Sequence, residues 1–91
     1  MEKENWKGFL KLCLSAKTEK QLDALFDLFL TPEEKSSITT RHAIVHELLA
    51  EKKPQRQIAA ELAVSIAKIT RGSNELKRIS PKLRGFLKEN G

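Results

Sequence analysis

Apolar residues recur along this chain at intervals of three and four positions, and charged residues fill many of the positions between them. This period is that of an amphipathic helix, and no stretch shows the strict alternation of a half-buried strand. Capping residues and prolines divide the pattern into six segments. We therefore expect an all-α fold of six short helices without a sheet. The expected helices cover residues 3–16, 19–29, 32–51, 55–62, 66–77 and a last segment that begins at 81.

Three of these helices begin with recognisable local signals. Thr31 is placed to cap the third helix, with Pro32 at the first helical position and Glu34 completing a capping box. Ser65 and Ser80 are good caps for the fifth and sixth helices, because a hydroxyl accepts a hydrogen bond from a free N–H group of the first turn. In the last helix we expect Leu83, Phe86 and Leu87 to form the buried side.

The first two helices carry a large apolar surface. The first has a stripe at helical spacing, formed by Trp6, Phe9, Leu10 and Cys13. Trp6 is expected in a core or an interface rather than in a functional role. In the second helix, Leu28 lies well off the arc that the other apolar residues share. A short helix that is apolar on more than one side must be covered on more than one side, so we expect a second subunit to pack against it.

Residues 55–77 have the pattern of a helix-turn-helix, which is two short helices joined by a tight turn. Small Ala59 lets the helices approach, and Ala63 fits the bend, where glycine is commoner. Val64 and Ile69 are expected to fill the angle between the helices. The packed side of the second helix should carry Ile66, Ile69, Ser73 and Leu76. In the DNA-binding form of the motif this helix lies in the major groove; two helices of an unrelated bundle are the alternative.

Charge is distributed unevenly over the 91 residues, which are few enough for a single domain. Residues 1–39 hold 6 Lys/Arg and 7 Asp/Glu, a net charge of −1, whereas residues 40–91 hold 11 and 5, a net charge of +6. A basic half that coincides with a helix-turn-helix favours DNA as the partner. Without the motif, a solvated lysine-rich surface would be the simpler interpretation.

Other features exclude some functions. Cys13 is the single cysteine, so a reducing compartment is expected, and no stretch is long enough to span a membrane. His42 and His46 have the spacing of a two-histidine metal site, but Ala43 stands where a zinc protease has its glutamate and no third ligand is apparent, so we expect no metal. No nucleophile–base pair, carboxylate dyad or phosphate loop is visible, and an enzyme is not expected.

Gly72 is unusual because it stands inside the second motif helix, where glycine costs up to about 1 kcal/mol relative to alanine. Either another helix packs close to it or a ligand touches its backbone, and the sequence does not distinguish these. Arg71 beside it has a planar guanidinium that can pair with a carboxylate and stack on an aromatic ring. A phosphate contact is the alternative for Arg71.

Four segments together resemble the tryptophan repressor family. They are LTPEE (30–34), TRHAIVHELL (40–49), QRQIAAEL (55–62) and SIAKITRGSNELK (65–77), and they cover about half of the chain. The resemblance implies a bacterial, cytoplasmic protein and an all-helical, intertwined homodimer. It also implies L-tryptophan as corepressor, with no other cofactor, and operator double-stranded DNA as the partner. The first helix matches the family only in character.

The resemblance also implies a set of ligand-binding residues. The indole ring would lie between Arg41 and Arg71, and Arg71 would also pair with the ligand carboxylate, near the hydroxyl of Thr31. Gly72 would lie against the ligand. The remaining implied residues are Leu28 and Leu30, whose carbonyl groups from the other subunit would receive the ammonium group.

Glu75 departs from the family pattern, which has a small hydroxyl residue there. Its carboxylate could pair with the ligand ammonium, which would tighten binding, or with Arg71, which would compete with the ligand carboxylate.

For DNA, the family pattern points to Gln55, Arg56, Ile66, Ala67, Lys68 and Thr70, with Lys77 near phosphate. Ala59 and Lys68 depart from that pattern, so operator preference is expected to differ.

Two other function classes stay open. One is a helix-turn-helix module with no small ligand or a different one, such as a replication-initiator-like or constitutive DNA binder. The other is a protein-interaction domain that uses the apolar helices.

Overall fold

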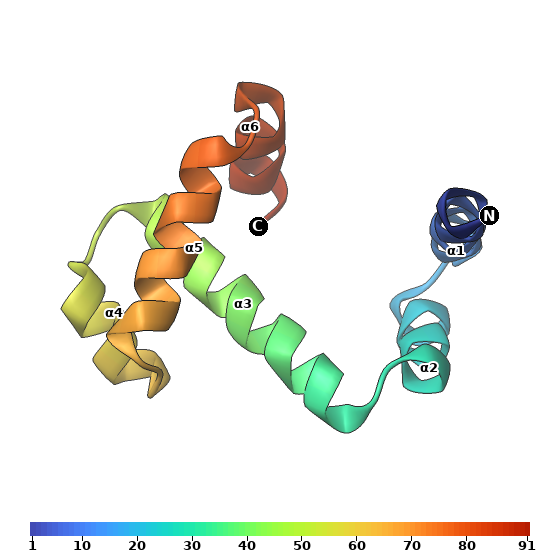
Figure 1. Cartoon of the computed structure of the whole chain (residues 1–91), viewed down its shortest axis with the longest axis horizontal. Coiled ribbons are helices and arrows are strands. Elements are labelled where there is room, and N and C mark those ends of the chain that lie inside the picture. Colours follow the sequence, from blue (N-terminus) through green and yellow to red (C-terminus); the bar gives the residue numbers. More distant parts are fainter. The chain divides into compact units, whose positions relative to one another are not determined.

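All 91 residues are described in a computed structural model, and every regular element in it is a helix (Figure 1). The prediction of an all-α fold with six helices is confirmed. The expected bounds of the first five helices and the expected start of the sixth differ from the observed ones by no more than one residue. The helices are α1 (Glu2–Ser15), α2 (Glu19–Phe29), α3 (Pro32–Ala50), α4 (Gln55–Leu62), α5 (Ile66–Arg78) and α6 (Pro81–Asn90).

Packing of the backbone divides the chain into two compact units, residues 1–36 and 37–91. The boundary lies inside α3, so the first turns of this helix belong to the first unit and the rest to the second. The expected single domain stays a prediction. None of the six helices combines the length and the apolar character that crossing a membrane requires.

Side-chain caps mark the beginnings of four of the helices, α2, α3, α5 and α6. The hydroxyl of Thr31 accepts from the N–H of Glu34 at 3.1 Å, and the carboxylate of Glu34 accepts from the N–H of Thr31 at 2.8 Å. This reciprocal pair is the predicted capping box. Ser65 and Ser80 each accept from the N–H three residues ahead, as predicted. Thr18 caps α2 in the same way, with its hydroxyl accepting from the N–H of Gln21 at 3.1 Å, and this cap was not predicted.

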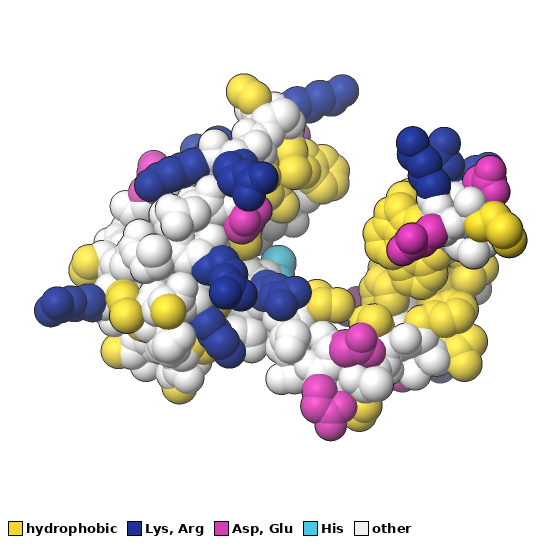
Figure 2. Space-filling model, in the orientation of Figure 1, with side chains coloured by type: hydrophobic (Ala, Val, Ile, Leu, Met, Phe, Trp, Pro, Cys, Tyr) yellow, Lys and Arg dark blue, Asp and Glu magenta, His cyan; other side chains and the backbone are white.

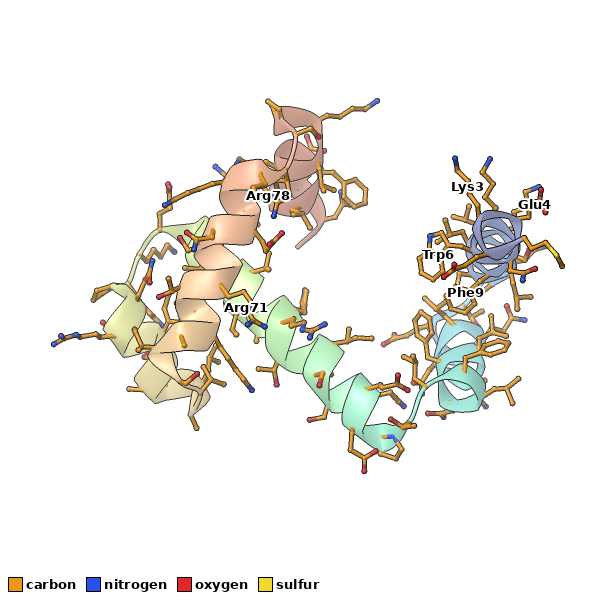
Figure 3. The ribbon with its side chains drawn as sticks, in the orientation of Figure 1. Lys3, Glu4, Trp6, Phe9, Arg71 and Arg78 are labelled. Atoms are coloured by element: carbon orange, nitrogen blue, oxygen red, sulfur yellow. The ribbon has the colours of Figure 1, made fainter.

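In the first unit, aromatic rings join α1 to α2. Phe9 stacks with Trp6, which is labelled near it in Figure 3, and forms an edge-to-face pair with Phe29. The ring centroids are 5.5 Å apart in both pairs. Trp6 remains 59% exposed and Phe29 50% exposed. No residue of α1 or α2 is fully buried. The two helices therefore leave a large part of their apolar surface uncovered within this unit.

The core of the second unit lies where α3, α4 and α5 meet. Its buried residues are Ile44, Ile58, Ala59 and Ile69, with Leu48, Leu62 and Val64 packed against them. Ile58 is 1% exposed and Ile69 is completely buried. The predicted packing of Ala59, Val64 and Ile69 is confirmed. This core fixes α5 against both neighbouring helices, and so determines which sides of α5 face outward.

The turn of the helix-turn-helix places Ala63 in the left-handed region, with φ 55° and ψ 44°. An L-residue with a Cβ atom adopts this conformation at a cost of about 1–2 kcal/mol, which explains why glycine suits the position. The N–H of Val64 donates to the carbonyl of Ala59 at 3.0 Å and closes the end of α4. The tight turn therefore forms despite the unfavourable backbone angles.

Lys53, in the connection between α3 and α4, forms ion pairs with both helices. Its ammonium lies 2.8 Å from the Glu61 carboxylate and 3.3 Å from the Glu47 carboxylate. Hydrogen bonding to Glu61 and then to Glu47 raises the pKa of Lys53, and the bond from Lys53 lowers the pKa of Glu61. These bonds link the connection to a helix on either side of it, so they help to orient α4.

The two helical glycines have different surroundings. A Cβ atom added to Gly72 would lie 3.0 Å from Cγ2 of Ile44 and 3.4 Å from Cδ1 of Leu48, both on α3. Close packing of α3 therefore accounts for the glycine at this position. A Cβ atom added to Gly85 in α6 would meet nothing within 4 Å.

We expect Gly85→Ala to raise the free energy of unfolding by about 0.5–1 kcal/mol, because alanine loses less backbone entropy in a helix and enters open space here. Gly72→Ala should gain less or lose stability, because the buried and β-branched Ile44 has little freedom to move away. Urea denaturation of both variants gives the comparison. An equal gain at both positions would contradict the close contact at Gly72.

One prediction for α6 is wrong for the chain by itself. Leu83 is 44% exposed and Phe86 is 60% exposed, whereas only Leu87 of the expected buried side is half-buried. The side chain that ties α6 to α5 is Arg84, whose guanidinium donates to the carbonyl of Leu76. Nothing in the second unit covers the remaining apolar side of α6.

Candidate ligand and nucleic-acid sites

Helix α5 organises both candidate sites because its sides have different surroundings. Ile69 and Leu76 are buried, and Gly72 and Ser73 are half-buried. The other residues of the helix are exposed. Ile66, expected on the packed side, is 47% exposed because it occupies the first turn, beyond the core.

Four of the seven predicted ligand residues belong to the second unit: Arg41, Arg71, Gly72 and Glu75. Gly72 marks the point where α5 packs on Ile44 of α3. Arg71 directly precedes Gly72, and Arg41 lies about one turn before Ile44. Both guanidinium groups therefore start near this crossing of helices, and Figure 3 shows Arg71 on the side of α5 beside α3.

Charge at this crossing is not balanced inside the chain. Arg41 and Arg71 are exposed, and no carboxylate of the chain forms an ion pair with either. Glu75 pairs instead with Arg78, at 3.4 Å. The pairing of Glu75 with Arg71, one of the two alternatives left by the sequence, is therefore not observed.

The other three predicted ligand residues belong to the first unit and lie at the junction of α2 and α3. Leu28, 74% exposed, and Leu30 are at the C-terminal end of α2, where carbonyl groups lack helical partners and the helix dipole favours a cation. The Thr31 hydroxyl uses a lone pair to accept from Glu34. Its own hydrogen stays available to donate to a carboxylate.

The residues predicted to contact DNA lie on the helix-turn-helix. Gln55, at the start of α4, places its amide oxygen 3.4 Å from the Thr70 hydroxyl of α5. This contact joins the start of α4 to the second turn of α5. Gln55 is half-buried, and the other six are exposed: Arg56, Ile66, Ala67, Lys68, Thr70 and Lys77. Basic side chains stand out over α4, α5 and α6 in Figure 2.

His42 and His46 lie one turn apart on α3 and are both exposed, with ring centroids 6.4 Å apart. The chain contains no group of three or more His, Cys, Asp and Glu residues that could hold a metal ion. Arg78, the partner of Glu75, was not among the predicted site residues. Its three-residue spacing from Glu75 was the signal available, because side chains so spaced are neighbours on a helix.

Comparison with known proteins gives a consistent result. A family model described as Trp repressor protein matches residues 4–91. A relative from Chlamydia caviae is 52% identical over 83 residues, which is 91% of this chain and 82% of the relative. A relative from Chlamydia trachomatis serovar D is 43% identical, over 97% of this chain and 94% of the relative. A relative from Vibrio campbellii is 41% identical, over 96% of this chain and 87% of the relative. All three are named as Trp operon repressor homologs.

Proposed function

Because this chain belongs to the Trp repressor protein family, we propose that it is a tryptophan-responsive transcriptional repressor, which binds L-tryptophan as corepressor and then operator DNA. The observation that carries the proposal is the division of α5 into distinct sides. One helix holds two buried residues, an arginine without an ion pair beside the contact with α3, and an exposed first turn. If ligand binding moves this helix, the proposed DNA-contacting residues of α5 move with it, because they are part of the same helix.

The repressor acts as an intertwined homodimer in this proposal. Apolar side chains left exposed within one chain support it, in the first unit Trp6 and Phe29 and in the second Leu83 and Phe86. Each would be covered by the partner subunit. A domain of this size buries only about 60–65% of the surface of its unfolded chain, so added burial in a dimer would stabilise it.

The proposed tryptophan site consists of the residues that the family resemblance implies. The indole ring lies between the guanidinium groups of Arg41 and Arg71, which can stack on an aromatic face. Arg71 also pairs with the ligand carboxylate, near the hydroxyl of Thr31. The ammonium meets the carbonyl groups of Leu28 and Leu30 of the partner subunit. Gly72 lies against the ligand, in addition to its contact with α3.

For DNA, the first turn of α5 enters the major groove, and the dimer places two such helices about 34 Å apart, in successive grooves. Lys77 lies near a phosphate, and Gln55 and Arg56 contact the DNA from the start of α4. The residues nearest the bases are Ile66, Ala67, Lys68 and Thr70. Tryptophan favours the tilt of α5 that fits this spacing. A hundredfold preference for that tilt corresponds to about 2.7 kcal/mol of coupling, which is typical of allosteric proteins.

The test is to titrate the purified chain with L-tryptophan by calorimetry, and then to measure affinity for operator-like duplexes with and without the ligand. Binding of one ligand per chain that strengthens DNA binding supports the proposal. DNA binding that is independent of tryptophan would indicate the ligand-free helix-turn-helix class instead. Absence of any salt-dependent DNA affinity would indicate a protein-interaction domain.

We expect Lys77→Ala to weaken binding of all DNA sequences about equally and to reduce the slope of log affinity against log salt by about 1, because a phosphate contact releases counterions. Lys68→Ala is the matched variant, since it removes the same charge from the first turn of α5. It should change the ranking of operator variants. If the ranking of operator variants is unchanged, Lys68 contacts only the DNA backbone.

A further inference from the structure

Glu75 is the single acidic residue between Glu61 and Glu89, and it is exposed in the second half of α5. Seven basic residues share this stretch: Lys68, Arg71, Lys77, Arg78, Lys82, Arg84 and Lys88. A carboxylate on a helix that approaches DNA opposes the attraction that the surrounding cations provide. Because Glu75 weakens the attraction to DNA, a carboxylate at this position is expected to have another role that favours it.

The position of Glu75 relative to Arg71 suggests that role. Four residues on a helix advance one turn and leave the two side chains about 40° apart around the axis. The two groups are not joined, because Glu75 pairs with Arg78 at 3.4 Å. Helix α5 therefore presents a guanidinium and a carboxylate on neighbouring turns of one side. This pair of charges is complementary to the carboxylate and ammonium of a free α-amino acid.

We propose that Glu75 makes this chain select ligands with a free ammonium group, and that Arg78 competes with the ligand for the Glu75 carboxylate. The inference rests on the proposed function, in which Arg71 takes the ligand carboxylate. An ammonium held by that contact lies within reach of the next turn of α5. The Glu75 and Arg78 side chains are 65% and 77% exposed. Exposed pairs of this kind are weak, so a bound ammonium can displace Arg78.

A simpler role for the Glu75–Arg78 pair is support of the helix, because a glutamate three residues before an arginine stabilises a helix slightly. The two roles differ in what they predict for ligands. Helix support affects all ligands alike, whereas selection for an ammonium group affects only the ligands that carry one.

The experiment compares L-tryptophan with indole-3-propionate, which lacks the ammonium, by calorimetry on the full chain. Glu75→Gln should lower the ratio of the indole-3-propionate Kd to the tryptophan Kd about tenfold, through loss of a hydrogen bond between charged groups. Glu89→Gln removes the same charge from α6 and should leave the ratio unchanged. Arg78→Ala should tighten tryptophan binding about two- to threefold by removing the competitor.

The outcomes separate this inference from the proposed function. If Glu75→Gln still binds tryptophan and has the wild-type ratio, Glu75 only supports the helix and the inference is wrong. If the wild-type chain binds neither ligand, the proposed function is wrong. Glutamine keeps the helix propensity of glutamate, and the melting temperature of Glu75→Gln checks that its fold is intact.

Discussion

Arg71→Ala is expected to weaken L-tryptophan binding about 100-fold, because it leaves the ligand carboxylate desolvated without its charged partner. The fold should be unaffected, with the free energy of unfolding changed by no more than about 0.5 kcal/mol, since Arg71 is exposed and makes no ion pair in the chain. Calorimetry measures the ligand affinity and urea denaturation measures the stability. Tryptophan should then no longer strengthen DNA binding.

Arg71→Lys is the matched control for this result. Lysine keeps the positive charge but loses the planar fork that pairs with a carboxylate and stacks on an indole ring. An intermediate affinity is therefore expected. Wild-type tryptophan binding by Arg71→Ala would show that the ligand site lies elsewhere on the chain.

Ile69→Ala is expected to lower the free energy of unfolding by about 2–5 kcal/mol, the cost of removing a large buried side chain and leaving a cavity. Ile69 is completely buried where α3, α4 and α5 meet. Small proteins are stable by only about 5–15 kcal/mol in total, so this loss is large. Urea denaturation at fixed protein concentration measures it, because the stability of a dimer depends on concentration.

Ile66→Ala provides the comparison, since it makes the same substitution three residues earlier on the same helix. Ile66 is 47% exposed, so its replacement should cost less than about 1 kcal/mol. DNA binding by Ile66→Ala should weaken while its stability stays close to that of the wild type. Equal destabilisation by the two variants would contradict the position of the core.

Features decided by neighbouring residues were predictable from the sequence. The capping box of Thr31 and Glu34 and the caps at Ser65 and Ser80 need only a few consecutive residues, and all of them form as expected. For the same reason the bounds of the first five helices and the start of the sixth were predicted to within one residue. The close packing of the two motif helices was also predictable, because small and branched residues have characteristic positions in that motif.

Features decided by distant contacts were not predictable. The sequence could not decide why Gly72 is a glycine, because the answer lies in Ile44 and Leu48 on another helix. It placed Leu83 and Phe86 in a buried side that one chain does not cover. It also missed the pairing of Glu75 with Arg78. The roles of the ligand and DNA residues depend on a partner subunit and on bound molecules, and they stay predictions.

Helix α5 packs three kinds of residue into 13 positions, which restricts how this chain can change over generations. Three consecutive residues have unrelated roles. Ile69 is buried in the core, Thr70 lies at the proposed DNA surface, and Arg71 lies at the proposed ligand site. Replacing several consecutive residues of this helix would therefore affect stability, DNA binding and ligand binding together. We therefore expect operator or ligand preference to change through single substitutions at separate positions, such as Lys68 and Glu75, which lie about two helical turns apart.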